Sequence, residues 1–235
     1  MKFISFLLIA FTFGQQPVDK NYLLGRFVPA TDSRFVQLTS AHTKRIASHD
    51  YLRKETYDAF VKMAKNAAKE GVKLVIISAT RNFDDQKKIW ENKWTGKIKV
   101  EGKDLTTVPD LKERARLILL YSSMPGTSRH HWGTDMDLNS WDNSYFSTGE
   151  GLKIYEWLSA HASEFGFCQP YTSKTNGRTG YEEEKWHWSF LPLSNLFLEE
   201  YQKQISYSDI EGFEGSEIAI QLQTIDNYVG GVACR

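Results

Sequence analysis

The stretch SRHHWGTDMDLN, residues 128–139, gathers two histidines and two aspartates around a single glycine. His130 and Asp137 are seven positions apart, and Gly133 between them permits a tight bend. Such a bend can bring a histidine before it and an aspartate on the following strand to one point. Imidazole and carboxylate are ordinary zinc ligands, so the stretch predicts two ligands of a metal site.

A third ligand is expected on a neighbouring element. The downstream segment EEEKWHWSF, residues 182–190, has the alternation of a strand, and it places His187 between two tryptophans, three residues after Glu184. Three protein ligands leave a fourth zinc position open, which is typical of a catalytic site. Glu184 would stand near that position as a general base. The competing interpretation makes residues 182–184 a solvated loop edge.

The pattern of apolar residues predicts the elements that carry these segments. Spacing typical of helices covers residues 50–70, with Gly71 as a stop, and residues 83–94, 109–121, 149–166 and 195–204. Short apolar or alternating runs predict strands within residues 72–80, 167–172 and 185–190. We expect an α+β fold in which a small antiparallel sheet carries the zinc site and helices flank it.

The composition fits one domain. Of 235 residues, 41% are hydrophobic, enough for one good-sized core. Lys plus Arg equals Asp plus Glu at 29 each, so no overall basic field would draw the chain to nucleic acid or an anionic membrane. We therefore expect residues 17–235 to form a single domain that ends in a helical tail.

The N-terminus resembles a secretory signal peptide. Residues 3–13 form an apolar run that is too short to span a bilayer, and cleavage is expected near residues 14–16. An N-terminal strand of the fold is the alternative. No later apolar run reaches membrane length, so we expect a mature chain without a membrane span, exported to the periplasm or beyond the cell.

The two cysteines, Cys168 and Cys234, are candidates for a disulfide because export places them in an oxidising compartment. Such a bridge would tie the end of the chain to its middle. Two unpaired buried thiols are the alternative.

Several motifs taken together resemble the VanY-type D-alanyl-D-alanine carboxypeptidases, zinc peptidases that share a fold group with lysostaphin-like peptidases and hedgehog. The motifs are S-x-H-x-x-G-x-x-x-D at residues 128–137, E-x-W-H at residues 184–187, and SATRNFDDQ at residues 78–86, which supplies Arg81 and Gln86. The family usually has a small residue two positions before the aspartate ligand, where this chain has Asp135.

The resemblance implies a role for each matching residue. His130, Asp137 and His187 would bind zinc, Glu184 would be the general base, and Arg81 would stabilise the oxyanion. Ser128 and Gln86 would contact the substrate. The remaining histidines, His131, His42, His49 and His161, are expected to be structural or surface residues, and a local capping role is the alternative for Arg81.

The implied activity is zinc-dependent hydrolysis of a peptide bond next to a D-amino acid in the stem peptides of peptidoglycan. D-alanyl-D-alanine carboxypeptidase is the leading hypothesis. The alternatives are a D,D-dipeptidase or L,D-endopeptidase acting on the same polymer, and a non-catalytic module that zinc stabilises.

Overall fold

A computed structural model of the chain describes residues 18–43 and 50–234. The expected signal peptide and His49 lie outside the described residues, and both interpretations stay predictions. The α-helices are α1 Lys20–Leu23, α2 Lys54–Lys69, α3 Phe83–Trp94, α4 Leu111–Ile118, α5 Gly149–His161 and α6 Leu191–Gln204. The strands are β1 Phe35–Gln37, β2 Tyr51–Arg53, β3 Ile76–Ser78, β4 Asp135–Leu138, β5 Phe167–Cys168 and β6 His187–Phe190.

Short helical turns connect these elements. They are η1 Pro29–Thr31, η2 Leu105–Thr107, η3 Arg129–Trp132, η4 Asn143–Ser147, η5 Ala162–Phe165, η6 Lys174–Asn176, η7 Tyr207–Asp209, η8 Ser216–Ile218 and the π-helical η9 Ile225–Val229. Among the described residues, no helix is both long and apolar enough to cross a membrane.

A four-stranded antiparallel sheet lies at the centre of the fold. Its strand order is β3-β4-β6-β5, and β1 pairs with β2 in a separate two-stranded sheet. In the pairing of β4 with β6, Asp135 lies opposite Ser189 and Asp137 lies opposite His187. The prediction of an α+β fold with helices around a small antiparallel sheet is confirmed.

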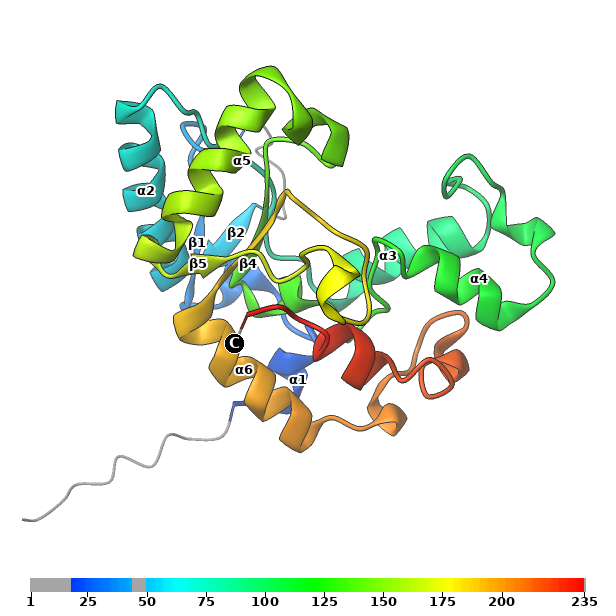
Figure 1. The fold of residues 1–235 in the computed structure, drawn as a ribbon. Helices are drawn as coiled ribbons and strands as arrows, with labels where there is room; N and C mark the ends of the chain where they lie inside the picture. The colour runs from blue at the N-terminus through cyan, green and yellow to red at the C-terminus, as the bar shows by residue number, and fades with distance from the viewer. Residues whose placement is uncertain (1–17, 44–49, 235) are drawn as a thin grey trace, which may run out of the picture.

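The two faces of the central strands differ in chemistry because neighbouring side chains point to opposite sides. Met136 and Trp188 belong to a hydrophobic cluster that also contains residues of α2 and α5. Figure 1 shows these two helices on the same side of the sheet. Asp137 and His187, one residue away along each strand, point to the opposite face. The sheet therefore has an apolar face against two helices and a polar face for the candidate site.

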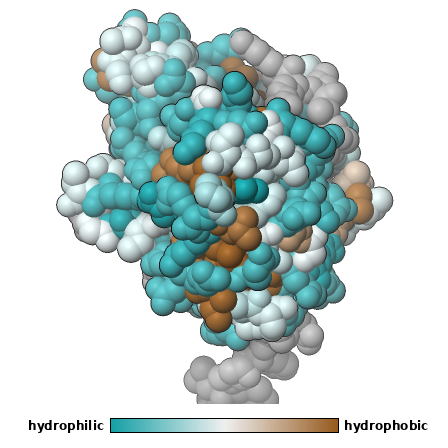
Figure 2. Space-filling view, turned by 90° about the vertical axis from the view of Figure 1, so that its right-hand side faces the viewer, coloured by the Kyte–Doolittle hydropathy of each residue, from teal (hydrophilic) through white to brown (hydrophobic). Residues whose placement is uncertain are grey.

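A second hydrophobic cluster holds α1, α3, α4 and α6 to the C-terminal tail. Trp90 of α3, for example, donates from Nε1 to the backbone oxygen of Glu214 at 2.8 Å. The tail then returns to β5, where a disulfide joins Cys168 to Cys234, as the sequence predicted. On the side of α3 and α4 the surface is mostly hydrophilic, with a strip of hydrophobic residues near its centre (Figure 2).

The helix predicted over residues 50–70 begins later than expected. Residues 51–53 form β2 instead, because they pair with β1 and because the backbone N–H of Arg53 donates to the oxygen of Gly133 at 3.0 Å. The three predicted strands also form, but each is shorter than its apolar or alternating run.

Two other helix ends differ for local reasons. The helix predicted over residues 109–121 starts at Leu111, because the Asp110 side chain caps its first turn. The helix predicted near residues 195–204 starts earlier, at Leu191, with Pro192 in its first turn. Backbone N–H groups in the first turn have no partner within the helix, so the N–H that proline lacks costs no hydrogen bond there.

Candidate functional site

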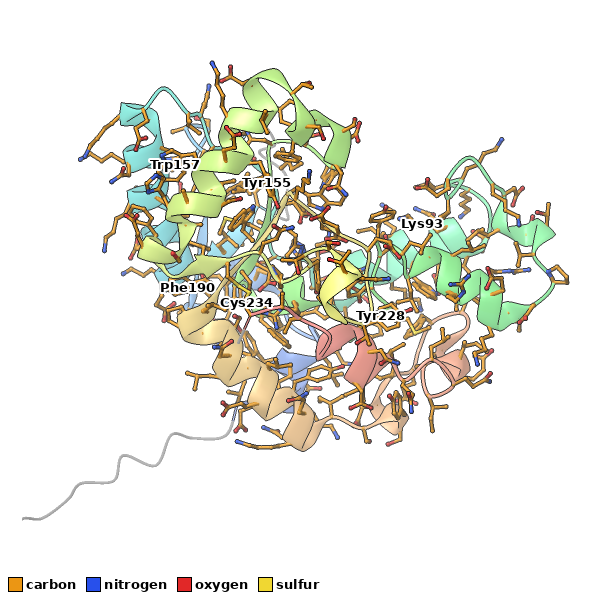
Figure 3. The ribbon with its side chains drawn as sticks, in the orientation of Figure 1. Lys93, Tyr155, Trp157, Phe190, Tyr228 and Cys234 are labelled. Carbon is orange, nitrogen blue, oxygen red and sulfur yellow. A yellow bond between two sulfur atoms is a disulfide. The ribbon has the colours of Figure 1, made fainter. Side chains whose placement is uncertain are left out.

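A cavity of about 950 Å³ lies beside β3 and β4 on the polar side of the sheet. Its wall includes His130 and Asp137 of the stretch 128–139, Glu184 from the loop before β6, and Arg81 from the loop after β3. Helix α3 adds Lys93 from its last turn (Figure 3). The cavity thus gathers residues from distant parts of the chain.

Gly133 makes the bend that the sequence predicted. It follows η3 with φ +70°, a left-handed conformation that side chains rarely adopt. A Cβ atom at this position would also collide with the ring of Phe35. His130 lies on η3 before the bend and Asp137 on β4 after it, so the glycine sets their relative position.

His130, Asp137 and His187 form a compact buried cluster that can hold a metal ion, with ligand atoms that all lie within 4.8 Å of one another. Oδ1 of Asp137 is 3.3 Å from Nε2 of His130 and 3.2 Å from Nδ1 of His187. Nε2 of His130 and Oδ1 of Asp137 are buried without a hydrogen-bond partner. Because buried polar atoms are rarely left unpaired, these atoms fit a metal ion as the missing partner.

Hydrogen bonds on the far side of each group turn its ligand atom toward the cluster. Nδ1 of His130 is bonded to the backbone oxygen of Ala79 at 2.8 Å, which leaves Nε2 to accept a metal. Nε2 of His187 is bonded to Oδ2 of Asp135 at 2.9 Å, which leaves Nδ1. On Asp137, Trp141 donates to Oδ2 at 3.2 Å, which leaves Oδ1.

The electrostatics of the cluster are strongly coupled. Burial would raise the pKa of Asp137, but the neighbouring His130 and His187 outweigh it and hold that pKa well below its ordinary value. Burial lowers the pKa of His130, and Arg81 lowers it further. Burial would likewise lower the pKa of His187, but the nearby carboxylates of Asp135, Asp137 and Glu184 raise it well above its ordinary value.

Glu184 lies next to the cluster and on the wall of the cavity. Its Oε2 is 3.4 Å from Nδ1 of His187, and its side chain is almost fully buried. Burial raises the pKa of its carboxyl group, which makes the group a better proton acceptor. Its backbone N–H donates to the oxygen of Tyr171 at 2.9 Å, and this bond holds the loop in place.

Arg81 contributes positive charge at the same wall. Its Nη1 donates to Oγ of Ser78 at 3.2 Å and is 3.9 Å from Oδ2 of Asp137. Lys93, which belongs to none of the sequence motifs, has a half-buried ammonium group that donates to Oγ of Ser122 at 2.5 Å. Burial and the charge of Arg81 lower the pKa of Lys93. Arg81 and Lys93 are thus two of the three cationic residues that line the cavity among the described residues, and Lys88 is the third.

Ser128 and Gln86 are not among the described residues that line this cavity. Ser128 is buried at the start of η3, and its Oγ has no hydrogen-bond partner. Gln86 is buried on α3 and donates from Nε2 to the backbone oxygen of Ser123 at 2.8 Å. Substrate contact by either residue therefore stays a prediction.

His131 points away from its neighbour His130. Its Nδ1 is bonded to the backbone oxygen of Arg81 at 2.6 Å, and its Nε2 accepts from the N–H of Gly126 at 3.0 Å. Burial lowers its pKa to about 3, so the ring is neutral and structural. The other described histidines are likewise outside the cluster: His42 is bonded to the hydroxyl of Tyr57, and His161 is paired with Glu164.

Comparison with known proteins identifies the family. Residues 49–193 match the family described as VanY: D-alanyl-D-alanine carboxypeptidase. Among curated proteins, the chain is 29% identical to the putative carboxypeptidase YodJ of Bacillus subtilis, over 80% of this chain and 66% of that protein. It is 28% identical to a D-alanyl-D-alanine carboxypeptidase of Enterococcus faecalis, over 80% of this chain and 62% of that protein. The match thus spans somewhat less than two thirds of the length of these relatives.

Solved structures show the same fold. The LdcB LD-carboxypeptidase aligns with a TM-score of 0.55 and 22% identity, over 84% of this chain and 81% of LdcB. The vancomycin resistance D,D-pentapeptidase VanY of a VanB-type cassette, solved with Zn(II), aligns with a TM-score of 0.51 and 21% identity, over 81% of this chain and 92% of VanY. The chain therefore belongs to the VanY family of D-alanyl-D-alanine carboxypeptidases.

Proposed function

We propose that this protein is a zinc-dependent carboxypeptidase that removes a terminal D-amino acid from the stem peptides of peptidoglycan. The observation that carries the proposal is a cluster of three convergent ligand atoms, two of whose residues, His130 and Asp137, line the same cavity as Glu184 and Arg81. A purely structural metal site needs neither a neighbouring base nor a cation facing the same space. Curated relatives named as carboxypeptidases support the same reaction class.

The three cluster residues, Glu184 and Arg81 each have a role in this reaction. His130, Asp137 and His187 would hold zinc, which supplies Lewis-acid chemistry and lowers the pKa of water to about 7. Glu184 accepts a proton from the attacking water and passes it to the leaving amine. The guanidinium of Arg81 offsets the negative charge that develops on the carbonyl oxygen.

Arg81 and Lys93 place positive charge on the cavity wall, where it can bind the free terminal carboxylate of a substrate. Arg81 and Lys93 interact with each other across the wall, and the repulsion between them is relieved when an anion is bound. A terminal carboxylate of a stem peptide carries that charge. An internal peptide bond does not, so the two cations favour a carboxypeptidase over an endopeptidase.

The proposed site of action is outside the cytoplasm, in the periplasm or beyond the cell. The disulfide supports this placement, because disulfides persist in oxidising compartments. Residues 1–16 would be removed on export, and residues 17–235 would remain as a single zinc peptidase domain with its helical tail.

The decisive experiment incubates zinc-loaded protein with defined stem peptides and identifies the products by mass. We expect loss of one D-alanine from a pentapeptide or from a tetrapeptide, and the preferred substrate distinguishes D,D from L,D cleavage. Glu184→Gln is the matched control, because it keeps the size of the side chain but removes the proton acceptor; its kcat should fall about 10²–10⁴-fold with zinc content unchanged. No mass change with any peptide would instead favour a non-catalytic module.

A further inference from the structure

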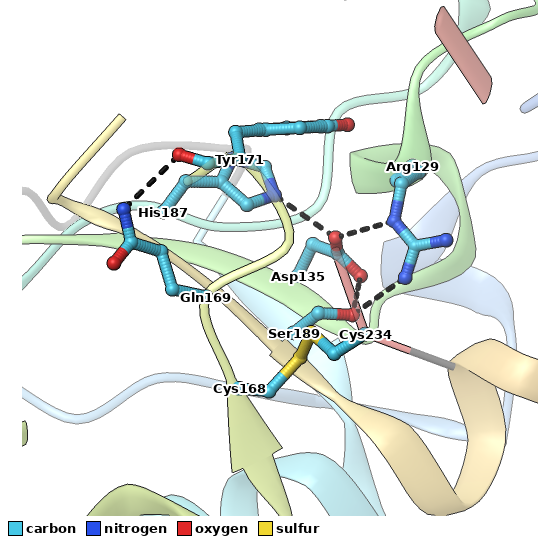
Figure 4. Close-up of a disulfide and its surroundings, with 8 residues drawn as sticks. All are labelled: Arg129, Asp135, Cys168, Gln169, Tyr171, His187, Ser189 and Cys234. Atoms are coloured by element: carbon cyan, nitrogen blue, oxygen red, sulfur yellow. Dashed lines mark hydrogen bonds and ion pairs between the residues drawn. A yellow bond between two sulfur atoms is a disulfide. The ribbon is translucent and has the colours of Figure 1, made fainter. Parts of the chain in front are cut away.

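Asp135 is a buried acid that the metal cluster does not use. Its side chain is fully buried on β4, and both of its oxygens are bonded (Figure 4). Oδ2 accepts from Nε of Arg129 at 3.0 Å and is 2.9 Å from Nε2 of His187. Oδ1 accepts from Oγ of Ser189 at 2.8 Å and from Oγ1 of Thr134 at 2.7 Å. Three of these four partners reach it from other elements, Arg129 from η3 and both His187 and Ser189 from β6, so the site is built for a carboxylate.

The ring of His187 lies between two carboxylates. Its Nδ1 is 3.2 Å from Oδ1 of Asp137, and its Nε2 is 2.9 Å from Oδ2 of Asp135. A neutral imidazole has one N–H and one lone pair. If Nε2 carries the hydrogen and donates to Asp135, the lone pair of Nδ1 points into the cluster. The hydrogen bond thus selects both the orientation of the ring and the tautomer that can bind a metal.

We propose that Asp135, together with Arg129 and Ser189, is a positioning unit that holds His187 with Nδ1 toward the metal. The proposal rests on the proposed function, since it assigns the unit to the zinc site. A small residue, which is usual at this position in the family pattern, cannot accept a hydrogen bond from Nε2. The unit therefore depends on the carboxylate of Asp135.

Arg129 neutralises the charge of Asp135 and holds the unit in place through further contacts. Its guanidinium pairs with Asp135, donates from Nη2 to Oγ of Ser189 at 2.7 Å, and lies 4.9 Å from the ring centre of Trp132. A buried carboxylate without such a partner would be strongly unfavourable. Arg129 also precedes His130 on η3, and Ser189 is the strand partner of Asp135 on β6. The unit therefore connects the three elements that each provide one ligand.

The test measures zinc affinity by competition with a chelator, on folded metal-free protein whose circular dichroism matches wild type. Asp135→Ala removes the acceptor and should weaken zinc binding about 100-fold, and Asp135→Asn, which keeps a neutral acceptor, should weaken it about 10-fold. Thr134→Val is the matched control, because it removes a hydrogen bond from the other oxygen of the same carboxylate; its affinity should stay within about threefold of wild type. Cobalt-substituted Asp135→Ala should also show a shifted visible spectrum.

The outcomes separate this proposal from the proposed function. Affinity within twofold of wild type in folded Asp135→Asn would overturn the positioning role, and so would an equal loss in Thr134→Val. If Asp135→Ala does not fold, the asparagine variant alone decides. A wild-type protein that binds zinc but cleaves no stem peptide would count against the proposed function alone, whereas one that binds no zinc would overturn both.

Discussion

Replacement of Gly133 by alanine tests whether the bend between His130 and Asp137 organises the site. The residue has φ +70°, and an added Cβ would collide with the ring of Phe35 and lie 3.1 Å from Cγ of Arg53. The left-handed conformation costs a non-glycine residue about 1–2 kcal/mol, and forcing a methyl group into a packed site costs about 1–3 kcal/mol. Alanine also restricts the unfolded chain more than glycine does, and this raises the free energy of unfolding by about 0.4–1 kcal/mol.

The free energy of unfolding should therefore fall by about 2–4 kcal/mol in Gly133→Ala. Gly71→Ala is the matched control, because Gly71 has φ +75° but nothing within 4 Å of the added Cβ. The free energy of unfolding of Gly71→Ala should fall by about 1 kcal/mol or less, because the left-handed backbone is strained but the added methyl group meets no neighbour. Denaturant unfolding of both variants gives the comparison, and zinc titration of Gly133→Ala should show weaker binding because η3 shifts relative to β4. Equal losses of stability in the two variants would refute the reasoning about Phe35.

The other predictions concern the metal, the substrate and the disulfide. His187→Ala should retain substoichiometric zinc after dialysis, whereas His131→Ala should retain a full equivalent despite lower stability; equal zinc contents by atomic absorption would contradict the ligand assignment. Lys93→Met should raise KM for stem peptides about tenfold with little change in kcat, because a charge-assisted hydrogen bond to the substrate carboxylate is lost. The wild-type protein should show a similar rise in KM with a C-terminally amidated peptide. An unchanged KM in Lys93→Met would exclude Lys93 from carboxylate binding. Reduction of Cys168–Cys234, which are 66 residues apart, should lower the free energy of unfolding by about 2–4 kcal/mol. The measurement is denaturant unfolding with and without reductant, with Cys168→Ser as the reference, and coincident curves would rule out a stabilising bridge.

The sequence predicted those parts of the fold and site whose signals are local. Residues 83–94 form a helix with the predicted bounds, and a capping box between Asn82 and Asp85 marks its start. The bend at Gly133 and the alternation around His187 also follow from neighbours in the chain. Their meeting in one cluster follows from the need of a zinc site for a third ligand and from the family resemblance.

The features that the sequence did not predict depend on long-range contacts. Strand β2 has three residues, too few for a periodic pattern, and it forms because β1 and the backbone of Gly133 provide hydrogen-bond partners. Lys93 looks like any exposed lysine of a helix until the fold brings it to the cavity wall. The sequence has Asp135 two residues before Asp137, but it does not show that Arg129 and Ser189 complete the surroundings of Asp135.

The position of Asp137 opposite His187 makes the ligand set depend on how β4 aligns with β6. If the pairing slipped by one residue, His187 would point to the apolar face and the cluster would lose a ligand. The unfolded chain has no ready-made binding site, because His187 is 50 residues from Asp137 along the sequence. Binding of the proposed ion would thus stabilise the correct alignment of β4 with β6 over misaligned ones. Only correctly aligned molecules would gain the binding free energy, about 4 kcal/mol at a free ion concentration one thousand times Kd.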